Sequence, residues 1–169
     1  MTINDLYDGR IIKYSIEVFP PKNGGSPESL FSTIESFDKF RPAFVSITYG
    51  ALGNARGGTV ELSTKIKRDY NLETLTHLTA AGKSRQELEN ILIGARYAGV
   101  ENILALRGDA PAGKSFTKHK QGHRYAYQLV EQMAAMNQGK YLQGEGECTN
   151  FNIGVACYPE GHKDNPRKH

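Results

Sequence analysis

The sequence lacks the features that define several large protein classes. It has only two cysteines, Cys148 and Cys157, with neither a second pair nor a histidine at the spacing of a zinc site. No apolar run approaches the roughly 18 residues of a membrane helix, and the N-terminus lacks the basic and apolar segments of a secretory signal. These absences predict reduced thiols, no metal site, no membrane association and a cytoplasmic location.

The sequence also has little excess of one sign of charge over the other. The formal net charge is only +3, and basic residues cluster only within residues 118–124 and 163–169. We expect both clusters to be solvated, and we expect no nucleic acid partner. With 38% hydrophobic and 23% charged residues, the 169 residues have the composition of one globular domain spanning residues 1–169.

Sequence signatures of the common nucleotide and nucleophile sites are missing too. The first apolar segment is not followed by G-x-G-x-x-G, and the chain has no phosphate-binding loop of the Walker type. No G-x-S-x-G nucleophile elbow occurs, which leaves acyl transfer by serine without support. A nucleotide cofactor, if the protein binds one, is therefore expected in the mouth of a barrel.

Apolar runs that favour strands alternate with segments of helical periodicity. The predicted strands are Ile11–Phe19, Ala43–Thr48, Thr74–Thr79, Asn102–Arg107 and Phe151–Cys157. Strict alternation and nearly continuous hydrophobic strands are typical of a parallel α/β fold.

Local signals mark the four expected helices. Ser26 is a candidate N-cap with Pro27 at the first helical position, and a second helix is expected over residues 59–68. Ser84 and Glu87 form a capping box for the third helix, which Gly99 should end. Apolar residues spaced from Ala126 to Met133 predict the fourth helix, and residues 137–150 read as a loop-like insertion.

Polar residues stand where the predicted strands end. Carboxyl ends of parallel strands meet at one edge of a sheet, so we expect these side chains to share one basin. They are Glu17, Thr48, His77, Arg107, Asp109 and Tyr158.

Each of these residues has a structural alternative. Glu17 is either a solvent-facing strand residue or a carboxyl group in an apolar site, where it would hold its proton and suit general acid catalysis. His77 is either a hydrogen-bonded core histidine or a site residue. The run from Arg107 to Asp109 is either a structural turn or a site for a polar, phosphorylated ligand.

Five ordered motifs resemble those of flavin-dependent methylenetetrahydrofolate reductases. They are Ser15–Lys22, Phe44–Ala51, His77–Thr79, Ala105–Asp109 and Tyr158–His162. The resemblance implies a (β/α)₈ TIM barrel that carries FAD and reduces 5,10-methylenetetrahydrofolate to 5-methyltetrahydrofolate with NADH or NADPH. It also implies a homo-oligomer in one-carbon metabolism.

The resemblance assigns roles to particular residues. Glu17 matches the general acid that protonates N10 of the folate, and Asp109 matches a catalytic carboxylate beside the flavin. The remaining matches are cofactor-binding positions, namely Thr48, Tyr49, Ala51, His77, Arg107, Gly108, Asp109, Tyr125, Ala126, Tyr158 and His162.

The match has a limit in length. A complete barrel has eight βα units and typically about 250 residues, whereas about five units are predicted here. A fragment of a longer enzyme is therefore expected. The alternatives are a catalytically silent binding module of the same family, and an unrelated barrel that acts on a phosphorylated metabolite through His77 and Asp109.

Overall fold

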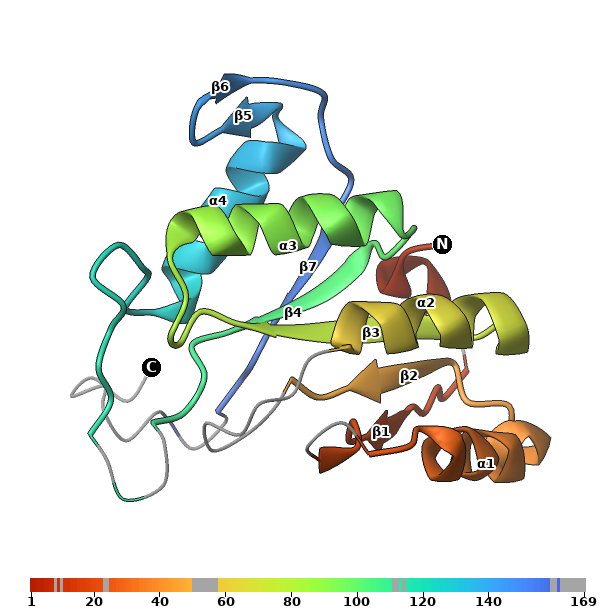
Figure 1. The fold of residues 1–169 in the computed structure, drawn as a ribbon. Helices are drawn as coiled ribbons and strands as arrows, with labels where there is room; N and C mark the ends of the chain where they lie inside the picture. Colours follow the sequence, from red (N-terminus) through yellow and green to blue (C-terminus); the bar gives the residue numbers. More distant parts are fainter. Residues whose placement is uncertain are drawn as a thin grey trace.

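The computed structural model describes residues 1–7, 9, 11–22, 25–49, 58–110, 113, 115–158 and 161. Its main sheet consists of β1 (Ile16–Val18), β2 (Phe44–Ile47), β3 (Glu73–Thr79), β4 (Asn102–Leu106) and β7 (Asn152–Val155). The helices are α1 (Glu28–Phe37), α2 (Thr59–Tyr70), α3 (Arg85–Tyr97) and α4 (Ala126–Asn137), with short 3₁₀ turns η1 (Ile3–Leu6) and η3 (Asp38–Phe40). A parallel α/β fold is thereby confirmed (Figure 1).

The five strands lie side by side in the order β1-β2-β3-β4-β7, and every pair is parallel. Each βα unit thus adds its strand beside the previous one, without the reversal of order that marks a doubly wound sheet. All five strands end at the same edge of the sheet.

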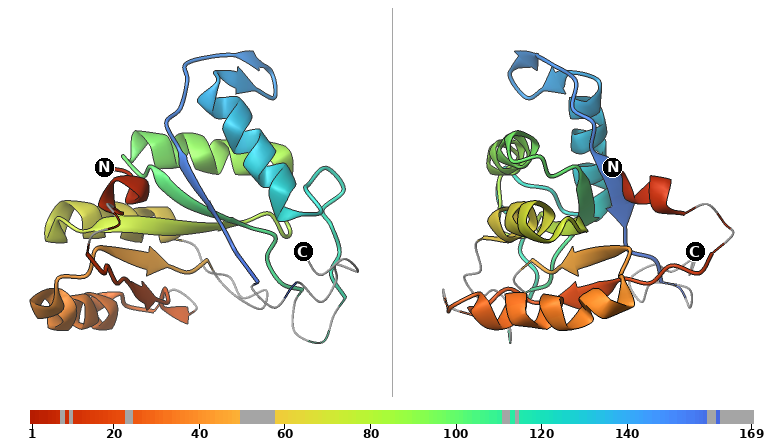
Figure 2. Two further views of the ribbon diagram at one scale, coloured as in Figure 1. Left: turned by 180° about the vertical axis from the view of Figure 1, so that it is seen from behind. Right: turned by 90° about the vertical axis from the view of Figure 1, so that its right-hand side faces the viewer.

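All four long helices bury their apolar stripes against one face of this sheet. Around β1 and β2, one core cluster joins Val45 and Ile47 to Ile34 of α1 and Ile66 of α2. A second cluster joins the central strands to α3 and α4, and its fully buried members include Leu88, Leu92, Ile103, Leu129 and Met133. Figure 2 shows α2 and α3 on one side of the sheet and η1 on the other.

The opposite face carries polar side chains. Near the amino ends of the strands, the fully buried Asn102 accepts hydrogen bonds from the backbone of Ile3 in η1 and from the side chain of Asn152, at 2.8 and 2.9 Å. These bonds hold η1 across the sheet and leave the carboxyl ends of the strands clear of it.

Sequence signals at α3 are confirmed. Ser84 Oγ accepts from the Glu87 backbone at 3.1 Å, and the Glu87 carboxylate accepts from the Ser84 backbone at 2.7 Å. At the other end, Gly99 has a φ of 73°, the left-handed conformation that terminates a helix.

Several predicted boundaries are wrong. The first strand covers only Ile16–Val18 instead of residues 11–19, because it is an edge strand whose pairing with β2 spans three residues. Ser26 is not the N-cap of α1: Pro27 is, and the helix begins at Glu28, although Ser26 Oγ accepts a 3.3 Å bond from the Glu28 backbone. The last strand ends at Val155, before Cys157.

The segment 137–150 is more ordered than the predicted loop. After α4 it forms an antiparallel hairpin of β5 (Lys140–Tyr141) and β6 (Gly144–Glu145). The buried carboxylate of Glu89 accepts a 2.8 Å hydrogen bond from the Leu142 backbone, which ties this hairpin to α3.

Candidate active site

A cavity of about 760 Å³ lies at the carboxyl ends of β2, β3, β4 and β7. Nine residues expected from the sequence to bind a cofactor line it, namely Thr48, Tyr49, His77, Arg107, Gly108, Asp109, Tyr125, Ala126 and Tyr158. Of the six strand-end residues predicted to share one basin, Thr48, His77, Arg107, Asp109 and Tyr158 line this cavity and Glu17 does not. Ala51 and His162 lie outside the described residues.

Glu17 does not line the cavity itself but lies beside His77, which does. Its carboxylate Oε2 lies 3.8 Å from His77 Nε2, while Ser46 Oγ is 2.8 Å from the same nitrogen. Of the two alternatives for Glu17, enclosure by apolar neighbours is wrong, since its side chain is 52% exposed. The apolar neighbours Ile16 and Val18 face the helices, whereas Glu17 projects from the other face, which none of the helices α1 to α4 covers.

His77 is buried on the polar face of β3. Burial lowers the pKa of its imidazole, and the nearby charge of Glu17 opposes part of that shift. The ring is therefore neutral at pH 7, where it has one N–H donor and one acceptor nitrogen.

The backbone at the end of β4 packs tightly against the end of β3. Gly108 has a φ of 84°, and a Cβ atom there would stand 2.9 Å from Ala81 Cβ and 3.0 Å from Thr79 Cβ. Both the backbone conformation and the space therefore require glycine at the cavity wall.

The two charged residues beside Gly108 differ in their surroundings. The Arg107 guanidinium lies 5.0 Å from the centroid of the Phe116 ring, and its Nε donates to the Gly108 carbonyl at 3.4 Å. Asp109 lines the cavity and is exposed. Together they give this wall a cation and an anion close to one glycine.

The N-terminus of α4 supplies the aromatic wall. Tyr125 is its N-cap residue and stacks on Tyr127, with ring centroids 5.8 Å apart. The Gln128 side chain accepts from the Tyr125 backbone at 3.1 Å, which fixes the start of the helix and hence both rings.

Besides aliphatic lining residues, four residues of the basin with aromatic or hydroxyl side chains were not predicted from the sequence as site residues. Phe19, Thr79 and Tyr127 line the cavity, and Ser46 holds His77. Alternation along β2 could have indicated Ser46, because it lies two residues before Thr48 and thus on the same face.

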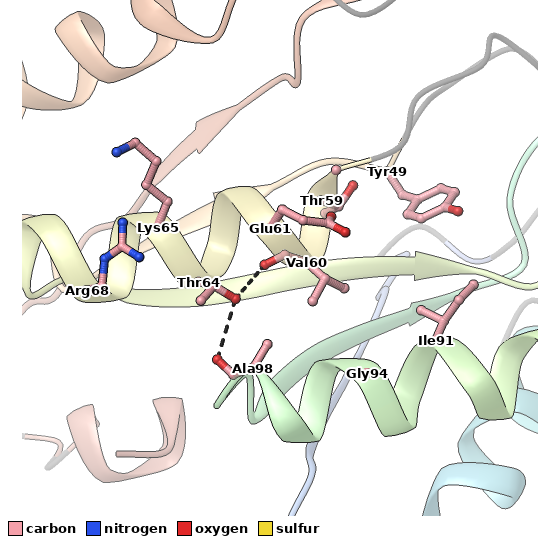
Figure 3. A pocket seen from close by; sticks show the side chains of 11 residues that line it. Tyr49, Thr59, Val60, Glu61, Thr64, Lys65, Arg68, Ile91, Gly94 and Ala98 are labelled. Atoms are coloured by element: carbon pink, nitrogen blue, oxygen red, sulfur yellow. Dashed lines mark hydrogen bonds between the residues drawn. The ribbon is translucent and has the colours of Figure 1, made fainter.

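A second cavity, of about 570 Å³, lies between α2 and α3 (Figure 3). Tyr49 lines both cavities. Lys83 Nζ lies 4.3 Å from the Tyr49 ring centroid and donates to the Thr79 carbonyl at 3.2 Å, so Lys83 supports the wall between the two hollows. Burial lowers the pKa of Lys83 and raises that of Tyr49.

Other functional signals are few in the part of the chain that the structure describes. That part holds no group of three or more His, Cys, Asp or Glu side chains placed to bind a metal ion. None of its helices combines the length and apolarity needed to span a membrane. Cys148 and Cys157 are both free and exposed.

The fold and the cavity define a parallel α/β protein with its candidate ligand site at the carboxyl ends of the strands, where such folds bind ligands. Residues 2–168 match the family model described as methylenetetrahydrofolate reductase. The chain belongs to this family.

Named relatives agree with the family match. Methylenetetrahydrofolate reductase 1 of Schizosaccharomyces pombe is 35% identical over 152 residues, which are 89% of this chain and 24% of that protein. Methylenetetrahydrofolate reductase (NADH) 1 of Arabidopsis thaliana is 34% identical with the same two shares. The 5,10-methylenetetrahydrofolate reductase of Pectobacterium carotovorum is 35% identical over 90% of this chain and 46% of its own length. The chain thus spans between 24% and 46% of the length of these relatives.

Proposed function

We propose that the protein containing this chain reduces 5,10-methylenetetrahydrofolate to 5-methyltetrahydrofolate, with FAD as cofactor and NADH or NADPH as hydride donor. Family membership supports the reaction, and the name of the Arabidopsis relative, methylenetetrahydrofolate reductase (NADH) 1, supports NADH. The observation that carries the proposal is the convergence of nine expected cofactor positions on one cavity.

The described residues fit a flavin cofactor. Thr48 Oγ1 is buried at the cavity and has no hydrogen-bond partner among the described residues, and such an atom is costly unless a ligand or water satisfies it. Gly108 brings backbone to the cavity wall, where its close packing against Thr79 and Ala81 leaves no room for a side chain, and Tyr125 and Tyr127 present aromatic surface. Thr48, Tyr49, His77, Arg107, Gly108 and Tyr158 would hold the cofactor, with Ala51, Ala126 and His162 as further expected contacts.

When bound, FAD would supply the hydride chemistry, accepting a hydride from NAD(P)H and passing it to the methylene carbon of the folate. The chain's own residues would supply a proton and a charged group close to the cofactor. Glu17 would hold the proton that N10 of the folate receives as its bond to the methylene carbon opens. Asp109 would lie beside the flavin and contact the folate.

We also propose that residues 1–169 are a single partial domain that holds five of the eight βα units of a TIM barrel, with 137–150 as an insertion. The sequential strand order and the four helices on one face support a singly wound barrel over a doubly wound sheet. The expected homo-oligomer and cytoplasmic location belong to this proposal as well.

Neither alternative from the sequence is preferred. Membership of the methylenetetrahydrofolate reductase family leaves nothing in favour of an unrelated barrel acting on a phosphorylated metabolite. A silent binding module of the same family has no observation of its own in its favour.

The test is to purify the protein and follow three properties separately. We expect flavin absorbance in the purified protein, bleaching of that absorbance by NADH or NADPH, and its return when methylenetetrahydrofolate is added. A protein that is colourless and does not take up added FAD would contradict the flavin site. A flavoprotein that NAD(P)H reduces but folate never reoxidises would contradict the substrate.

A further inference from the structure

Three polar side chains on neighbouring strands form a cluster beneath the mouth of the basin. In the parallel register Glu17 pairs with Ser46, and Ser46 pairs with Leu75, two residues before His77. Because side chains alternate between faces with a period of two, Glu17, Ser46 and His77 project from the same face. Ser46 and His77 are both only 7% exposed, so the contacts they make are fixed by the sheet.

All contacts of this cluster converge on one nitrogen of His77. Nε2 has the Ser46 hydroxyl oxygen at 2.8 Å and the Glu17 carboxylate oxygen at 3.8 Å. No described residue forms a hydrogen bond with the other ring nitrogen, Nδ1, and His77 lines the cavity. Two oxygens beside Nε2, one of them from a carboxyl group, favour the tautomer that carries its proton on Nε2.

Building on the proposed function, we propose that Ser46 and His77 are positioning residues for Glu17. Ser46 Oγ accepts from Nε2–H and holds the imidazole at a fixed angle, so that the same N–H stands beside the Glu17 carboxyl group. This restricts where Glu17 presents its proton to the substrate, although neither Ser46 nor His77 is itself a proton donor in the reaction.

The proton transfer balances without any other group. The O–H bond of Glu17 breaks as the N10–H bond of the folate forms, and the electron pair of that O–H bond stays on Glu17 as a carboxylate. Nε2–H of His77 then lies beside this new negative charge and stabilises it without being transferred. Other polar groups near this arrangement do not add a charge to it from β2: Thr48, which follows that strand, is uncharged, and Arg107 and Asp109 follow β4 at the cavity wall.

The first test compares two serine substitutions. Ser46→Ala removes the acceptor for Nε2–H, and we expect it to slow reoxidation of the reduced flavin by methylenetetrahydrofolate roughly tenfold to hundredfold, because small displacements of reacting groups have effects of that size. Reduction of the flavin by NAD(P)H should keep its rate. Ser46→Thr retains a hydroxyl at the same position and should restore most of the lost rate.

A matched control separates positioning from simple loss of a buried hydrogen bond. Ser63 of α2 is also buried and bonds to β3, at 2.6 Å from Thr76 Oγ1, but on the helix-covered face. Ser63→Ala makes the same chemical change and should lower stability without slowing the folate step. If Ser63→Ala slows that step as much as Ser46→Ala does, Ser46 is only structural.

The second test needs neither turnover nor cofactor. Nitrogen-15 chemical shifts of labelled histidine, assigned with His77→Gln, report which ring nitrogen carries the proton. We expect Nε2–H in the wild-type protein near pH 7.5, and a mixture of tautomers in Ser46→Ala. A wild-type His77 protonated on Nδ1 would overturn the positioning role. A wild-type protein that binds flavin but never reduces folate would instead refute the proposed function, so the two failures are distinguishable.

Discussion

On the same strand, the two faces of the sheet bury different kinds of side chain, apolar on one face and polar on the other. On the helix-covered face, Val45 and Ile47 of β2 are fully buried among apolar neighbours. On the other face, Ser46 between them is nearly as buried but bonds to His77. A single strand therefore alternates between residues that stabilise the fold and residues that shape a site, which implies that substitutions on the two faces should affect separate measurements.

The largest expected effect is on the polar face. Glu17→Gln removes the proton but keeps the shape, and should slow folate-dependent flavin reoxidation by about 10²–10⁴-fold, the usual contribution of a general acid. Flavin binding and flavin reduction by NADH should persist, and the free energy of unfolding should change by less than about 0.5 kcal/mol. Stopped-flow absorbance measures both half-reactions.

Glu131→Gln is the matched control, because Glu131 is an exposed carboxylate on α4. It should leave both half-reactions unchanged. Normal folate turnover in Glu17→Gln would remove Glu17 from the mechanism.

A substitution that removes core side-chain atoms on the helix-covered face should instead lower stability. Leu92 of α3 is fully buried, and Leu92→Ala should lower the free energy of unfolding by about 2–5 kcal/mol. Denaturant titration measures the loss, and the 40% exposed Leu142 in the hairpin provides a control whose replacement by alanine should cost far less. Equal losses at the two positions would contradict the assigned core.

Gly108 both lines the cavity and packs tightly against the end of β3, so its substitution should affect both measurements. Gly108→Ala forces a positive φ on a residue with a Cβ and presses that atom against Thr79 and Ala81, at a cost of about 1–3 kcal/mol. Fluorescence titration should also show weaker flavin binding. Gly94 in α3 has open space around it, and Gly94→Ala should be neutral or stabilising by contrast.

The smallest effect concerns pH. Burial lowers the pKa of His77 below its value of about 6.5 in the unfolded chain, so the unfolded chain binds this proton more readily. The contribution of His77 to the free energy of unfolding is fully present above pH 6.5. It declines as the pH falls from there toward the lower pKa of the folded state. When the free energy of unfolding is measured from pH 8 to pH 5, its decrease toward acid pH should be shallower in His77→Gln than in the wild-type protein. An unchanged decrease would mean that other groups cause it.

Sequence reasoning recovered the elements whose signals are local. The Ser84–Glu87 capping box, the stop at Gly99 and the order of strands and helices follow from neighbouring residues, and the structure confirms them. Sequence reasoning did not predict the surroundings of Glu17. Adjacent apolar residues in a strand project to the opposite face, so they do not indicate what covers the carboxylate. The Ser46–His77 bond depends on the register between β2 and β3, which no single segment encodes.

The free thiols stand at opposite ends of β7. Cys157 lies between Ala156 and Tyr158, which both line the cavity, whereas Cys148 lies beyond the hairpin at the other end of the strand. A thiol-reactive dye would therefore place one fluorophore beside the basin and one remote from it. Ligand binding should protect Cys157 from labelling and leave Cys148 as an internal reference, so the native sequence already carries a paired optical reporter of occupancy.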